Sequence, residues 1–220
     1  MNLIAFECSK CLDGYRIITK PSPTKANRAR RAYYLVAASD RFEWYSPLEH
    51  FPTLFANFAE APANAEGLRR FADKFGLPGS DTDGNATEQM VYDILRDQAA
   101  IKRALAILEQ GDNQELVKLL RHGRNRWGQV ILVEPGQSGF ARLELRLGTS
   151  GKLETVIVPS NLIQAMWIQF LLHATSDAQL FRCQHCAKPF VVGSGTKRRS
   201  TAKYCSNACR FAAFQARQGA

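Results

Sequence analysis

The C-terminal part of the chain contains two closely spaced cysteine pairs. Cys183 and Cys186 form a C-x2-C motif, and Cys205 and Cys209 form a C-x3-C motif after a spacer of eighteen residues. A tetrahedral zinc ion takes four thiolates at about 2.3 Å, and each short spacer lets one turn of backbone deliver two of them. In a cytoplasmic protein, as expected here, such spacing favours a metal site over disulfides. The sequence therefore predicts one structural Zn²⁺ on these four cysteines.

Two other features of the sequence compete with this assignment. His185 lies inside the first motif, but four thiols already complete the shell, so we expect it to be exposed. Cys8 and Cys11 form another C-x2-C motif without a matching pair nearby. They could be half of a site completed by another subunit, a thiol pair activated by Lys10, or a coincidence on an N-terminal strand. We favour coincidence or a structural role, because two ligands cannot close a tetrahedron.

The segments around the four cysteines predict the local fold. Residues 189–192 are typical of a short strand, and the turn at 193–196 should return the chain to Lys203 and Tyr204 as a hairpin. Ser206 or Asn207 can then cap a helix that runs to about residue 216. A cysteine knuckle, a hairpin and a ligand-bearing helix together predict a treble-clef-type zinc finger.

The charge of the chain is unevenly distributed. The 220 residues include 29 Lys and Arg against 20 Asp and Glu, for a net charge of +9. Residues 181–220 contain eight of the cations and no acid, and residues 14–39 contain six cations and no acid, whereas residues 40–115 carry −7. Basic ends of this kind favour a polyanionic partner, because each neutralised phosphate releases counterions. A solvated basic surface explains the charge equally well.

Nucleic acid is the partner that this pattern predicts, with DNA favoured over RNA, and a homodimer is left open. The expected contacts are the basic side chains of the finger, namely Lys197, Arg198, Arg199, Lys203, Arg210 and Arg217. The acid-free segment 20–31 could add phosphate contacts. A protein-interaction module with a purely structural zinc, and an enzyme with an unrecognised site, are the alternatives.

The finger resembles the C-terminal zinc fingers of bacterial proteins related to the CGNR family. The resemblance rests on residues 181–190, on Arg198-Arg199 and on Tyr204-Cys-Ser-Asn-Ala-Cys-Arg210, with upstream runs at 45–59 and 68–77 that look like the N-terminal pattern found with such fingers. It departs after Cys209, where Arg210-Phe211 replaces Gly-Asn-Arg. The resemblance implies an α-rich N-terminal domain and DNA-linked regulation.

The rest of the chain predicts a mixed scaffold. Residues 31–38 and 41–45 should form two strands of one hairpin, and apolar spacing predicts a helix over 68–75. Asn85 and Glu88 have capping-box spacing before a helix of roughly six turns, and Asp112 and Glu115 repeat that spacing before a shorter one. Three strands over 129–134, 141–147 and 152–158 and a last helix from Ser160 should follow. We therefore expect an α+β fold, in which a helix-rich domain with a small antiparallel β-sheet (1–178) precedes a treble-clef-type finger (179–220).

Enzyme and membrane functions find little support in the sequence. No phosphate-binding glycine loop, nucleophile elbow or His-Glu-x-x-His helix is present, and none of the four histidines has a recognisable catalytic spacing. We expect His173, on an apolar helix, to be a core or interface residue. No apolar run approaches the roughly 18 residues of a spanning helix. These observations predict a cytoplasmic protein that uses no membrane, and they favour a non-enzymatic function while an enzyme with an unrecognised site stays an alternative.

Overall fold

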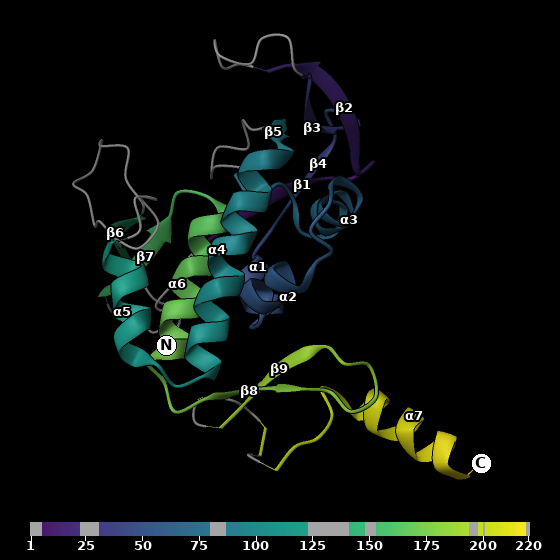
Figure 1. The fold of residues 1–220 in the computed structure, drawn as a ribbon, viewed down its shortest axis with the longest axis vertical. Coiled ribbons are helices and arrows are strands. Elements are labelled where there is room, and N and C mark those ends of the chain that lie inside the picture. The colour runs from purple at the N-terminus through teal and green to yellow at the C-terminus, as the bar shows by residue number, and fades with distance from the viewer. Residues whose placement is uncertain are drawn as a thin grey trace.

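The protein has a mixed α+β architecture, built from helices and small antiparallel sheets (Figure 1). The computed structural model describes residues 6–22, 31–79, 87–122, 141–147, 153–193, 198–199 and 201–218. The α+β class predicted from the sequence is confirmed. The strand predicted at 129–134 lies outside the described residues.

In the described part of the chain, the strands have three to seven residues and the helices four to nineteen. The strands are β1 (Cys8–Cys11), β2 (Tyr15–Pro21), β3 (Arg31–Ala37), β4 (Phe42–Tyr45), β5 (Glu88–Met90), β6 (Ala141–Leu147), β7 (Leu153–Pro159), β8 (Gln179–Arg182) and β9 (Pro189–Val192). The helices are α1 (Pro47–His50), α2 (Leu54–Glu60), α3 (Ala65–Phe75), α4 (Val91–Glu109), α5 (Asn113–His122), α6 (Leu162–Ala174) and α7 (Asn207–Gln218).

The N-terminal strands pair in an antiparallel manner in two small sheets. β1 pairs with β4 and β2 pairs with β3, so that Cys11 lies opposite Phe42 and Tyr15 lies opposite Ala37. Both strands predicted at 31–45 exist, but the predicted hairpin between them is wrong. β3 and β4 lie in different sheets, where β3 pairs with β2 and β4 pairs with β1.

The longest helix starts later than its capping pattern predicts. Glu88 belongs to β5, which pairs with β3, and α4 begins only at Val91. The Glu88 carboxylate forms an ion pair with Lys20 of β2 instead of capping a helix. Asn85, its predicted partner in a capping box, lies outside the described residues. The sheet therefore takes the residues that local spacing assigned to the helix.

The following elements agree more closely with the sequence. The backbone N–H of Glu115 donates to Asp112 Oδ1 at 2.9 Å, which confirms the cap of α5. β6 and β7 form the predicted antiparallel pair. The last helix before the cysteines, α6, is capped by Asn161, whose Oδ1 accepts from the N–H of Gln164 at 3.0 Å. Ser160, the predicted first residue, lies one position before that cap.

The main core lies between α2, α3, α4 and α6. Five of the seven residues of α2 are buried, and none of them was predicted as part of a helix. Phe58 of α2 packs on Phe71 of α3 with ring centroids 4.9 Å apart, and Phe55 packs edge-on against Phe170 of α6. Aromatic pairs of this kind stabilise a core beyond the area they bury.

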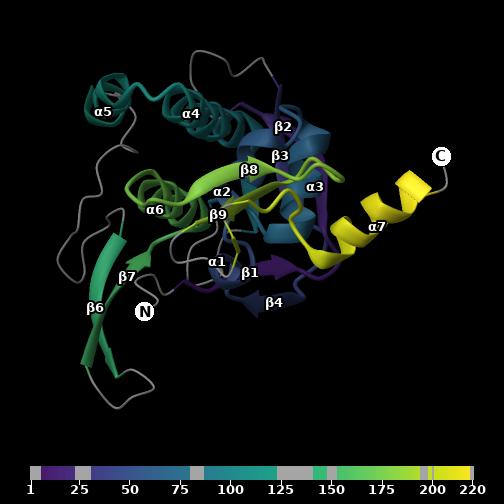
Figure 2. The same ribbon diagram turned by 90° about the horizontal axis from the view of Figure 1, so that it is seen from below.

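The cysteine-rich end forms a second and much smaller core. Its fully buried residues are Cys183, Phe190 and Val192, and they are separate from the main cluster. The β8–β9 hairpin lies against the body, whereas α7 points away from it and buries none of its residues (Figures 1 and 2). Whether residues 1–178 and 179–220 are separate domains stays a prediction.

Candidate metal centre and basic groove

The first cysteine pair is presented by a tight turn between two paired strands. β8 and β9 pair from Gln179–Val192 to Arg182–Pro189, so residues 183–188 form the loop of a hairpin, here called the knuckle. The N–H of Cys183 donates to the Lys188 carbonyl at 3.0 Å, and that of Ala187 donates to the Cys183 carbonyl at 2.9 Å. Ala187 has φ of +57°, which such a turn requires. The predicted hairpin partner, Lys203-Tyr204, is not a strand; β8 takes its place.

The second cysteine pair lies at the start of α7. The N–H of Cys209 donates to Ser206 Oγ at 3.1 Å, so Ser206 caps the helix as predicted. Cys205 lies just before this cap and Cys209 lies in the first turn, which directs both thiols to one side. The N–H of Gln184 donates to the Lys203 carbonyl at 3.0 Å and joins this segment to the knuckle.

These two segments bring four thiols into one cluster. The sulfur atoms of Cys183, Cys186, Cys205 and Cys209 all lie within 4.8 Å of one another. The Sγ atoms of Cys186 and Cys205, and those of Cys205 and Cys209, are 3.5 Å apart. Tetrahedral coordination at about 2.3 Å separates two sulfurs by about 3.8 Å, so the cluster matches the size of a thiolate metal shell. The four cysteines could hold a metal ion.

The pKa values of two thiols in this cluster, those of Cys183 and Cys205, are shifted in opposite directions. Burial disfavours the thiolate of Cys183, but backbone N–H groups around it outweigh burial and lower its pKa to about 6. Burial and the neighbouring thiols raise the pKa of Cys205 to about 12. A second thiolate would repel the first, so a bound cation is needed before all four sulfurs can ionise together.

The other candidate ligands lie outside the cluster. His185 is exposed on the knuckle, as predicted. Cys8 and Cys11 are buried on β1, and burial raises the pKa of Cys8 to about 12, so its thiol is protonated at neutral pH. Burial also opposes the Cys11 thiolate, but hydrogen bonds at Ser39 outweigh it and lower that pKa. Both side chains fill the core beneath α3, in agreement with a structural role.

A concave surface lies beside the second cysteine pair. This groove, here called the basic groove, has a volume of about 800 Å³ and extends from Arg198 to the first turn of α7. Its lining includes four of the six basic residues that the sequence assigned to nucleic acid, namely Arg198, Arg199, Lys203 and Arg210. No acid lines it among the described residues. The segment 198–210 thus places four positive charges around one hollow.

The six basic residues differ in their surroundings. Arg198 donates from Nη2 to the Cys205 carbonyl at 2.6 Å and lies over the Phe190 ring, so it also supports the metal loop. Arg217 Nη2 lies 3.2 Å from the Tyr204 hydroxyl and outside the groove lining. Lys197 lies outside the described residues. Arg199, Lys203 and Arg210 are exposed.

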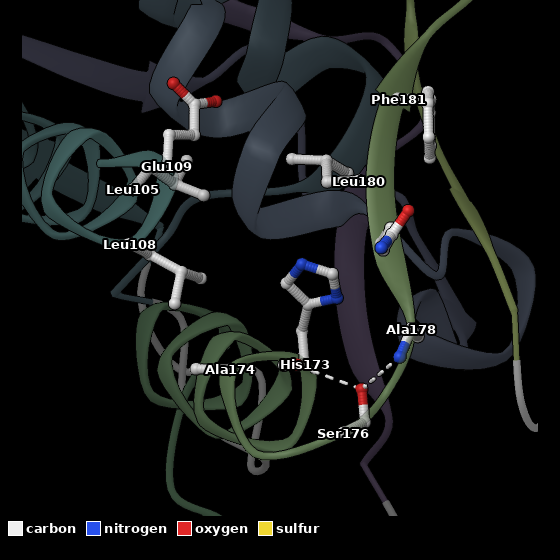
Figure 3. A pocket seen from close by; sticks show the side chains of 10 residues that line it. Leu105, Leu108, Glu109, His173, Ala174, Ser176, Ala178, Leu180 and Phe181 are labelled. Carbon is white, nitrogen blue, oxygen red and sulfur yellow. Dashed lines mark hydrogen bonds between the residues drawn. The ribbon is translucent and has the colours of Figure 1, made fainter. Parts of the chain in front are cut away.

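A different pocket, which the sequence did not predict, lies where α4 and α6 meet β8 (Figure 3). Its volume is about 450 Å³, and the His173 imidazole points into it between Leu108 and Leu180. Burial lowers the pKa of His173, so the neutral ring is favoured. The ring also packs 5.5 Å from Phe55, which agrees with the expected core or interface role.

No protein-family model matches the chain, and no curated protein matches its sequence. In the described parts of the chain, no helix has the length and apolar character needed to cross a bilayer.

Proposed function

We propose that this protein binds zinc through its four-cysteine cluster and nucleic acid through the basic groove. DNA is favoured over RNA on the charge pattern, and the protein would act as a regulator. The observation that carries the proposal is the convergence of Arg198, Arg199, Lys203 and Arg210 on one groove beside the metal centre. Four thiolates around Zn²⁺ contribute −2, so the last forty residues would keep a net charge of +6. That charge is sufficient to attract a phosphate backbone.

The choice of zinc follows from the donor set. Four thiolates in a compact cluster suit zinc or an iron centre, and zinc is the usual occupant of closed structural sites. A knuckle between β8 and β9 and a ligand-bearing α7 support a treble-clef-type finger. This arrangement is also what the resemblance to CGNR-like fingers implies.

The test of nucleic-acid binding replaces Arg199, Lys203 and Arg210 with alanine together. Arg198 is left unchanged, because its bond to the Cys205 carbonyl also holds the metal loop. Affinity for a duplex should fall similarly across sequences, and the slope of log K against log salt should flatten by about 0.9 for each lost phosphate contact. Fluorescence anisotropy at four salt concentrations measures both quantities.

A matched control removes three cations elsewhere. Arg70, Lys102 and Lys118 lie outside the groove lining, and replacing all three with alanine changes the net charge equally. This control should keep the wild-type slope. Equal losses in both triple variants would show that net charge alone attracts DNA, and absence of wild-type binding at low salt to duplex or single strands would contradict the proposal.

The protein-interaction module is the second candidate, and one observation favours it. Phe211 and Phe214 of α7 have exposed fractions of 62% and 55%, and they lie near each other on a helix that buries nothing. Exposed aromatic rings on one helix face suit a protein partner or a second copy of the chain. Loss of self-association in Phe211→Ser, in a protein that binds no nucleic acid, would favour this function.

A further inference from the structure

A cleft separates the knuckle from the body of the protein. Its volume is about 300 Å³, and its walls are the segment 50–53 with Asn57, the end of α3, and the start of β9. The two walls are fixed by direct contacts. Arg182 of β8 forms an ion pair with Glu60 of α2 at 2.7 Å, and the Thr53 hydroxyl donates to the Pro189 carbonyl at 3.4 Å.

Two lysines from opposite walls meet in this cleft. Lys74 comes from the last turn of α3 and Lys188 from the knuckle, 114 positions later in the chain. Within the described chain, neither forms an ion pair and no acid lines the cleft. Burial, followed by the positive charge of Lys188, lowers the pKa of Lys74. In the described part of the protein, the cleft therefore holds Lys74 and Lys188 on opposite walls, with Arg198 as a further cation and no acidic side chain in its lining.

The remaining lining residues suit an anion as well. Lys74 Nζ lies 4.8 Å and 5.4 Å from the ring centroids of Phe75 and Phe51, so aromatic faces hold its stem in place. Thr53 and Asn57 add polar side chains, and His50 adds a titratable one. Arg198 and Cys205 line both this cleft and the basic groove, so the two hollows adjoin.

We propose that this cleft binds a phosphate group between Lys74 and Lys188. A phosphate dianion neutralises two ammonium groups and offers acceptor oxygens to both. Because the cleft adjoins the basic groove, the phosphate can come from a nucleic acid that continues past Arg198, or from a free phosphate compound. The site itself does not depend on nucleic-acid binding by the groove.

The experiment titrates the zinc-loaded protein with inorganic phosphate and follows the lysine ε-CH2 signals by NMR. Chloride at matched ionic strength serves as the reference. Signals of Lys74 and Lys188 should shift with saturation. Lys74→Met and Lys188→Met, which keep the alkyl stems, should each weaken phosphate binding about tenfold, as expected for one charge-assisted hydrogen bond.

Lys102→Met is the matched control, because Lys102 is exposed on α4 and lines none of these hollows. It should bind phosphate as the wild type does. Thermal unfolding of each variant shows that the fold is kept, so a loss of affinity can be assigned to the cleft.

Two further arms distinguish the sources of phosphate. If the cleft takes a nucleic-acid phosphate, Lys74→Met should flatten the salt dependence of duplex binding by about 0.9, and phosphate should compete with DNA. If the cleft takes a free phosphate compound, Lys74→Met should leave the affinity for DNA unchanged and should still weaken the binding of inorganic phosphate. A protein that binds phosphate but no nucleic acid would contradict the function of the groove and support the cleft.

The proposal is overturned if phosphate produces no saturable shift, or if Lys74→Met binds it with unchanged affinity. In that case the lysines only offset the negative charge of the metal–thiolate centre. Lys188→Met would then lower the retention of zinc, while the response to phosphate stays that of the chloride reference.

Discussion

Asp97 is an acidic residue on the buried face of α4. It is 3% exposed, and its Oδ1 has no hydrogen-bond partner among the described residues. Arg96 Nε lies 3.6 Å away, an ion-pair distance that is too long for a hydrogen bond. Burial therefore dominates over Arg96 and raises the pKa of Asp97 to about 7.

This buried carboxyl should make stability depend on pH. Below pH 4 the side chain is protonated in both the folded and unfolded states, whereas between pH 4 and 7 only the unfolded state ionises. The free energy of unfolding should therefore fall as the pH rises from 4 to 7, by on the order of 4 kcal/mol at most. Asp97→Asn should flatten this dependence in urea unfolding measured from pH 4 to 8.

The exposed Asp40 provides the control. Asp40→Asn should follow the pH dependence of the wild type. A difference between wild type and Asp97→Asn that stays constant from pH 4 to 8 would show that the Asp97 pKa is the same in both states.

At the scale of elements, the junction between α3 and β1 depends on a glycine. Gly76 ends α3 with φ of +80°, and a Cβ there would lie 2.5 Å from the Ser9 carbonyl oxygen. Gly111, after α4, has φ of +73° but nothing within 4 Å of such a Cβ. The two positions share backbone conformation and differ in crowding.

Replacing each of these glycines with alanine should separate the energetic cost of a positive φ from the cost of a steric clash. Gly111→Ala should cost about 1 kcal/mol from the positive φ alone, and Gly76→Ala about 2–4 kcal/mol because α3 must also move from β1. Chemical denaturation measures both values. Equal costs would mean that the α3–β1 junction relaxes without loss.

At the scale of the whole molecule, the two cores differ greatly in size. The main core holds large buried side chains such as Phe55, Phe58 and Phe170, whereas the buried apolar cluster at the cysteine-rich end consists, among the described residues, of Cys183, Phe190 and Val192. So small a cluster cannot offset the conformational entropy of forty residues, so a metal ion held by the four cysteines would stabilise this end.

Removal of the metal should therefore loosen the C-terminal end and spare the body. Cys209→Ser should lose the one zinc expected per chain, and hydrogen exchange should rise over 179–218 but not in α4 or α6. Elemental analysis with exchange mass spectrometry measures both. His185→Ala, at an exposed position outside the cluster, should keep the zinc. Full metal retention in Cys209→Ser would exclude the four-cysteine site.

Much of the candidate site could be predicted from the sequence, because its chemistry is local. The spacings C-x2-C and C-x3-C determine which thiols one turn can present. Ser206 specifies the start of α7 through a hydrogen bond to Cys209, which lies only three residues later in the chain. The cap at Asp112 is local for the same reason. These features depend on backbone geometry within one or two turns.

The tertiary structure decided what depends on distant partners. Residues 31–37 and 42–45 have a strand-like composition, but their pairing depends on two other strands, β2 and β1, that lie earlier in the chain. Glu88 has a helix-cap spacing, yet pairing of β5 with β3 overrides it. Lys74 and Lys188 line one cleft because contacts of Arg182 and Thr53 hold the β8–β9 hairpin against the body. Strand partners and clefts result from contacts between segments far apart in the chain, which no local pattern encodes.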